Sequence, residues 1–217
     1  KDEVIVYSAH WDHLGIGEAI EGDSIYNGAV DNATGTAGLL EIAKAYVAAG
    51  KTKRSVLFLA VTAEEQGLLG SEYYSKHPLF PAKKTVANIN MDALQPHGRT
   101  KDMTIIGAGQ SDLEDIFIEV AAKRGREARG VASTTGAYFR SDHFNFAKIG
   151  IPAVYAGSGN EPLDMTKEEF EEKSKEYGRR GYHAPFDEYR PEVWDIRGML
   201  EEIKIFFEVG YQLSNSD

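Results

Sequence analysis

The sequence predicts an α/β fold, a three-layer sandwich in which helices flank a mostly parallel central sheet on both faces. Apolar runs of strand length alternate along the chain with segments whose apolar residues recur every three or four positions, as they do on one face of a helix. The strand-like runs are continuously apolar, which is typical of strands that are covered on both faces. The chain has 217 residues and is 42% hydrophobic, so we expect residues 1–217 to form one domain with a substantial core.

The expected strands are rich in β-branched and other apolar residues. They are EVIVYSA (3–9), SVLFLAVTA (55–63), VANINMDA (86–93), MTIIGA (103–108) and IPAVYAG (151–157). Helical patterns are expected at 35–50, at 68–76, at 111–125, at 141–150 and from about Pro191 to Leu213. The last helix is amphipathic, and we expect it to pack inside the domain.

One highly charged insert, residues 160–181, separates the last strand from the last helix. We expect a solvated surface helix there, because long charge runs usually face water. The alternative is a role in covering a site, in which Tyr177, Arg179, Arg180 and Tyr182 touch the substrate.

Composition limits the chemistry and the partners. The chain has no cysteine, so a metal ion would have to be held by oxygen and imidazole ligands. A formal net charge of -10 argues against nucleic acid as a general partner. No apolar run is long enough to span a membrane. Lys1 leads directly into a strand without a starting methionine, so we expect upstream elements of a longer protein to be missing.

Acidic side chains and histidines follow the expected strands where each strand ends. In open α/β sheets, ligands bind beyond the carboxyl ends of the strands, so such residues should converge. Two adjacent glutamates at the end of a buried strand also repel each other, and a metal ion would relieve that repulsion. The residues at strand ends are His10, Asp12, Glu64, Glu65 and Asp92, and Asp31 and His183 join them from positions just before helices.

Each of these residues also has a plain structural interpretation. Asp31 in GAVDNATG suits the start of a helix, and Asp92 suits a turn. Glu64 and Glu65 suit the first turn of a helix, where the dipole favours negative charge. These interpretations do not explain why all the residues occur at one edge of the sheet. We therefore expect a site for two divalent ions.

The ordered motifs AHWDH, GAVDNATG, TAEEQGLLGS, NINMDA, SDHFNFAKIGIPAV and YHAPFDEY resemble the M28 family of zinc metallopeptidases over about residues 3–213. The resemblance implies a single metallopeptidase catalytic domain that binds two Zn²⁺, other divalent ions being possible, and hydrolyses a peptide or aminoacyl substrate. Relatives in this family carry a helix and strands upstream of the first metal histidine, and this chain lacks them.

The resemblance also implies a role for each residue. Asp31 matches the carboxylate that bridges both ions, His10 and Asp92 match the other ligands of one zinc, and Glu65 and His183 match those of the second. Asp12 matches the carboxylate that orients His10, as metal-bound imidazoles generally require. Glu64 matches the general base, which activates a hydroxide held between the two ions.

Further residues are assigned less directly. Tyr138 matches a family position whose hydroxyl hydrogen-bonds the reaction intermediate, and a packing role is the alternative. Asp142 and His143 resemble the SDH motif of the family, which we interpret as structural support. His13 rivals His10 as a ligand, but its offset from the strand disfavours it. His77 and His97 are expected on the surface.

The substrate class stays open at this point. The family's commonest activity is that of an aminopeptidase, which is our main expectation. A glutamate carboxypeptidase would need an arginine for the substrate carboxylate, and the candidates are Arg140, Arg179 and Arg180. A non-catalytic, receptor-like domain of the same fold is the alternative from another class. We expect a secreted or periplasmic location, as is frequent in the family, and the sequence does not indicate an oligomeric state.

Overall fold

A six-stranded sheet forms the centre of the structure, a computed structural model that describes residues 2–132 and 136–216. Its strand order is β4-β1-β5-β8-β6-β7. The strands are β1 (Val4–His10), β4 (Ser55–Val61), β5 (Thr85–Asn90), β6 (Asp102–Ile106), β7 (Glu127–Val131) and β8 (Ala153–Ser158). Neighbouring strands run parallel, except that β6 is antiparallel to β8. The predicted α/β fold with a mostly parallel sheet is confirmed.

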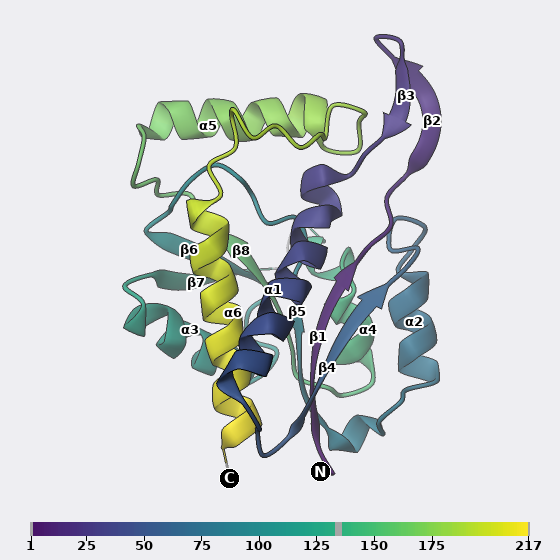
Figure 1. Cartoon of the computed structure of the whole chain (residues 1–217), viewed down its shortest axis with the longest axis vertical. Coiled ribbons are helices and arrows are strands. Elements are labelled where there is room, and N and C mark those ends of the chain that lie inside the picture. Colours follow the sequence, from purple (N-terminus) through teal and green to yellow (C-terminus); the bar gives the residue numbers. More distant parts are fainter. Residues whose placement is uncertain (1, 133–135, 217) are drawn as a thin grey trace.

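Helices cover both faces of this sheet, as Figure 1 shows. The helices α1 (Thr34–Ala49), α3 (Leu113–Lys123) and α6 (Arg197–Asn215) pack on one face, and α2 (Leu69–Lys76) and α4 (His143–Lys148) pack on the other. Alternate residues of β1 serve the two layers, because successive side chains of a strand point to opposite faces. Ile5 and Tyr7 join the first core cluster, whereas Val4 and Val6 join the second.

The last helix, α6, begins at Arg197, later than the expected start near Pro191. The backbone of Asp195 pairs with the loop at residues 96–98, since Asp195 N–H donates to the Pro96 carbonyl and Gly98 N–H donates to the Asp195 carbonyl. The N–H and carbonyl groups of Asp195 are therefore not available for the backbone hydrogen bonds of a helix. The rest of α6 packs as expected, with Ile205, Phe206 and Val209 fully buried.

Three strands were not anticipated from the sequence. The hairpin of β2 (Gly15–Ile20) and β3 (Asp23–Tyr26) projects from the body, and every residue of β2 is exposed (Figure 1). It therefore lacks the apolar pattern that burial imposes on a strand. The edge strand β7 is short and carries charged residues, so its sequence, EARGV, resembles a loop.

The charged insert forms the helix α5 (Lys167–Glu176) and the short turn η5 (Tyr177–Gly181), and α5 lies on the side of the sheet towards which β1 and β4 point (Figure 1). Phe170 is the buried residue of α5, so most of this helix faces water as expected. Within residues 2–132 and 136–216, no helix combines the length and hydropathy that crossing a membrane requires.

A capping box begins α5. The Thr166 hydroxyl accepts a hydrogen bond from Glu169 N–H at 3.2 Å, and the Glu169 carboxylate accepts one from Thr166 N–H at 2.9 Å. Thr166→Ala is expected to destabilise α5 by about 1 kcal/mol and to speed exchange of its amide hydrogens about fivefold. Thr166→Ser keeps the hydroxyl and is the control. Equal exchange rates in both variants would contradict this role.

Candidate metal centre

The predicted site residues lie at the carboxyl ends of three adjacent strands. His10 is the last residue of β1, Glu64 and Glu65 follow β4 within four residues, and Asp92 follows β5. The backbone turns sharply here, because Ala63 has a φ of 56° and Ala93 has a φ of 53°. Left-handed conformations are costly for residues with a β-carbon, and they gather at functional sites. Ala63 directly precedes Glu64 and Ala93 directly follows Asp92, so both turns flank site residues.

One group of ligand-type side chains surrounds His10, which is 1% exposed. Its Nε2 lies 3.3 Å from Oδ1 of Asp31 and 3.3 Å from Oδ1 of Asp92. Side-chain atoms of His10, Glu64 and Asp92 lie within 4.8 Å of one another. The Ser141 hydroxyl donates to the other Asp92 oxygen at 2.5 Å, which fixes that carboxylate.

Asp12 contacts the ring of His10 on its Nδ1 side, opposite the nitrogen that faces Asp31 and Asp92. The His10 Nδ1 lies 3.1 Å from the backbone carbonyl of Asp12, whereas the Asp12 carboxylate is 3.9 Å away. That carboxylate also accepts from Glu64 N–H at 3.4 Å. A ring that donates Nδ1–H to Asp12 directs the Nε2 lone pair towards Asp31 and Asp92, as a metal ligand requires.

A second group surrounds Glu65. The His183 Nε2 lies 3.1 Å from Oε2 of Glu65 and 3.4 Å from Oδ2 of Asp31. His183 has a φ of 54°, a third left-handed residue at this edge, and its ring stacks on Tyr182 at a centroid distance of 3.9 Å. His13 also belongs here, because its Nδ1 is 2.7 Å from Oε1 of Glu65. The sequence disfavours His13 as a rival of His10, whereas the structure brings both to the site.

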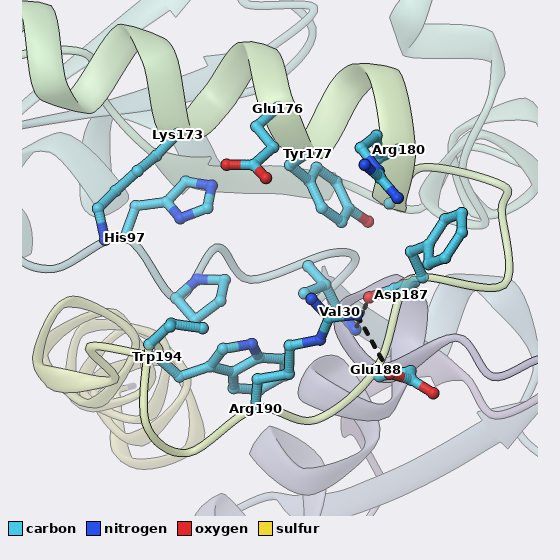
Figure 2. Close-up of a pocket in the computed structure, with 14 residues that line it drawn as sticks. Val30, His97, Lys173, Glu176, Tyr177, Arg180, Asp187, Glu188, Arg190 and Trp194 are labelled. Atoms are coloured by element: carbon cyan, nitrogen blue, oxygen red, sulfur yellow. Dashed lines mark hydrogen bonds and ion pairs between the residues drawn. The ribbon is translucent and has the colours of Figure 1, made fainter.

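Asp31 lies between the two groups, with one oxygen towards His10 and the other towards His183. It belongs to η1 (Ala29–Ala33), the turn before α1. Asp187 supports this turn, since its two oxygens accept from Val30 N–H at 2.8 Å and Asp31 N–H at 3.0 Å. Figure 2 shows Asp187 beside Val30. Asp187 stands in the quoted motif YHAPFDEY, but nothing in the sequence shows that its partners are backbone groups more than 150 residues away.

Replacing Asp187 should disturb the metal centre indirectly. Asp187→Asn puts an amide NH₂ where a carboxylate oxygen accepts a backbone N–H, so Asp31 would lose its fixed position. Loss of such supporting contacts typically weakens metal affinity about 10- to 100-fold. Competition with a chromogenic zinc chelator measures the change. Glu188→Gln, at the exposed neighbouring position, is the control, and an equal affinity in both variants would contradict the role of Asp187.

The protonation equilibria of the site suit a bound cation. Burial would lower the pKa of His10, but hydrogen bonds to Asp31 and Asp92 raise it to about 12. Burial, followed by the charge of Asp92, raises the pKa of Glu64 to about 9. Within the described residues, the ion pairs of Asp31, Glu65 and Asp92 are made with histidines. Carboxylates and imidazoles crowded in this way fit zinc, which would replace the protons that they otherwise hold.

Tyr138 does not join these groups in the described part of the chain. It is buried in an aromatic cluster, with ring centroids 4.8 Å from His143 and 5.8 Å from Phe144. Burial, followed by the charge of Glu114, raises the pKa of its hydroxyl. Asp142 and His143 are fully buried beside the site, and burial raises the pKa of Asp142 to about 6.

The expectation of a surface position holds for His77 but is wrong for His97. His77 is exposed at the end of α2, whereas His97 is half-buried against the rings of Phe170 and Tyr177. Burial, followed by the charge of Lys173, lowers the pKa of His97 to about 4, so the ring is neutral. The insert at residues 160–181 supplies these neighbours, and the local polar sequence of His97 did not reveal them.

Known proteins resemble this chain in sequence and in fold. A "Probable leucine aminopeptidase" of Arthroderma otae is 28% identical over 160 residues, which are 71% of this chain and 43% of that protein. A zinc aminopeptidase from Bacillus subtilis has a similar fold, with a TM-score of 0.73 and 21% identity over 99% of this chain and 47% of that one. Nicastrin, a component of gamma-secretase, gives a TM-score of 0.66 with 15% identity over 100% of this chain and 41% of that one.

The chain thus spans about half the length of the relatives it matches. The sequence profile of peptidase family M28 matches residues 1–205, which is nearly the whole chain. The six quoted motifs, the sheet and the two groups of ligand-type side chains lie in or across that region. The chain therefore belongs to peptidase family M28.

Proposed function

We propose that this chain is the catalytic domain of an aminopeptidase that uses two zinc ions to release N-terminal residues from peptides. The observation that carries the proposal is the position of Asp31 between two groups of carboxylates and histidines. A ligand set of this kind suits two adjacent divalent ions. The names of the relatives, a leucine aminopeptidase and a zinc aminopeptidase, support the choice of reaction.

The residues divide between the two ions as follows. His10 and Asp92 would hold one, Glu65 and His183 would hold the other, and Asp31 would contact both. His13 lies close enough to Glu65 to fix that carboxylate or to contribute to the second site. When bound, the ions lower the pKa of a water molecule and polarise the carbonyl of the scissile bond.

Glu64 would move the proton in this reaction. It lies beside His10 and Asp92, whereas Glu65 lies beside His13 and Asp31. Its carboxylate would accept a proton from the attacking water and deliver it to the leaving amine. A cation held by Asp92 would offset the charge that, after burial, raises the pKa of Glu64, and would so favour the ionised carboxylate that a base requires.

The alternatives differ in what the site would have to contain. Arg140 lies near Tyr182, whose pKa it lowers against the larger effect of burial, so it is the arginine to examine for a carboxypeptidase. Arg180 pairs with Glu21 at 3.1 Å and lies over the ring of Phe186. The likeness to nicastrin concerns the fold alone, and the full set of ligand-type residues at this site favours an enzyme over a receptor-like domain.

Hydrolysis of two substrate panels tests the proposal. One panel contains aminoacyl chromogenic amides with a free amino group, and the other contains N-blocked peptides with a free carboxylate. We expect the chelated protein to be inactive and added zinc to restore hydrolysis of the unblocked amides only. Zinc-dependent cleavage of the blocked peptides alone would replace the proposal with a carboxypeptidase. Zinc binding without turnover of either panel would favour the receptor-like alternative.

A further inference from the structure

A cavity of about 440 Å³ lies between the charged insert and the segment at residues 186–194 (Figure 2). None of the five predicted metal ligands lines it, although Asp187, which supports Asp31, forms part of its wall. Its volume falls within the range of about 300–1,000 Å³ that is usual for small-molecule sites. The cavity is therefore large enough for a ligand and separate from the metal centre.

Two opposite charges face this cavity from α5. Lys173 and Glu176 are three residues apart, which places them on the same side of a helix, and both line the cavity in Figure 2. Neither side chain forms an ion pair or hydrogen bond with the residues that the structure describes. Neighbouring charges on the same helix do form such pairs, as Lys175 does with Glu171 and Glu172.

The other charged groups of the wall already have partners. Arg190 pairs with Glu188 at 3.2 Å, and Arg180 pairs with Glu21 at 3.1 Å. The Asp187 carboxylate accepts from two backbone N–H groups. One cation and one anion thus remain for a ligand among the described lining residues.

The remaining wall is apolar, with two buried polar atoms. Trp194, Phe186 and Val193 supply apolar surface. The His97 Nε2 and the Tyr177 hydroxyl are buried without a hydrogen-bond partner in the described part of the chain, and both residues line the cavity. Because these two atoms are almost inaccessible, they lie behind the cavity wall, and the charged groups of α5 are the polar groups that a ligand would contact.

We propose that this cavity binds a free α-amino acid with an apolar side chain, at a site distinct from the metal centre. The carboxylate lies against Lys173, the ammonium group lies against Glu176, and the side chain lies on Trp194 and Phe186. Both charged groups of the ligand are then paired, and its apolar part is removed from water.

Fluorescence titration with L-leucine and L-phenylalanine tests this site. The chain has two tryptophans, so a Trp11→Phe background leaves Trp194 as the reporter inside the cavity. We expect saturable changes in fluorescence with the same Kd in zinc-loaded and chelated protein, because the metal ligands do not line the cavity. N-acetyl-L-leucine lacks the ammonium group and L-leucinamide lacks the carboxylate. In the chelated protein, each is expected to bind at least about tenfold more weakly than leucine.

Lys173→Ala is the decisive variant, and Lys175→Ala, on the same helix, is the matched control. We expect Lys173→Ala to raise the Kd for leucine about tenfold or more and Lys175→Ala to leave it unchanged. Equal Kd values in the two variants, binding that requires zinc, or no saturable signal would overturn the proposal. These measurements of binding do not depend on catalysis, so they test the amino acid site separately from the proposed aminopeptidase reaction.

Discussion

Glu64→Gln is expected to reduce kcat by about 10²- to 10⁴-fold while zinc content stays at the wild-type level. The substituted amide has nearly the same shape, so it fits the space beside His10 and Asp92, but it cannot accept the proton of the attacking water. Measurement requires kcat on an aminoacyl chromogenic amide together with metal analysis of the same sample. This combination separates loss of the base from loss of the ions.

Two matched variants show whether the effect belongs to Glu64. Gln66→Ala changes an exposed neighbour and is expected to keep activity near the wild-type value. Glu65→Gln changes the adjacent carboxylate, which contacts His13 and His183, and is expected to lower zinc content. Retention of wild-type kcat in Glu64→Gln would contradict the assignment of the base. Loss of zinc in that variant would instead make Glu64 a metal ligand.

The sheet and its edge were predictable because strand signals are local. Continuous apolar runs identify β1, β4, β5, β6 and β8, and the parallel pairing of β1, β4, β5 and β8 brings the carboxyl ends of these four to one edge of the sheet. His10, Glu65 and Asp92 follow three of these runs, so their convergence could be expected before their distances were known. Asp31 and His183 were weaker predictions from the residues alone, since each precedes a helix and does not follow a strand, and the family resemblance gave them their roles.

Features that depend on distant contacts were not predictable. His13 reaches Glu65 only because the chain turns after β1, and this turn has no apolar pattern. Asp187 accepts hydrogen bonds from the backbone N–H groups of Val30 and Asp31, and a sequence pattern does not reveal contacts with a distant backbone. The position of His97 depends on the insert that folds over it, so its polar local sequence was misleading.

Replacement of Asp31 should have a broader effect than replacement of any other predicted ligand. Its oxygens lie 3.3 Å from His10 and 3.4 Å from His183, which belong to different groups. Burial alone would raise the pKa of Asp31, but the hydrogen bonds to His10 and His183, together with nearby histidine charges, lower it overall. The carboxylate is therefore ionised and available to cations on both sides. Asp31→Asn removes a negative charge that both ions would share.

We expect Asp31→Asn to lose both zinc ions in a dialysis that leaves the wild-type protein loaded. Metal-ion catalysis contributes several kcal/mol, so kcat/KM should fall on the order of 10³-fold or more. Asp92→Asn and His183→Gln each affect one group, and each is expected to retain one ion. Circular dichroism of every variant excludes unfolding as the cause. If Asp31→Asn also retained one ion, Asp31 would serve a single site and the two groups would bind metal independently of each other.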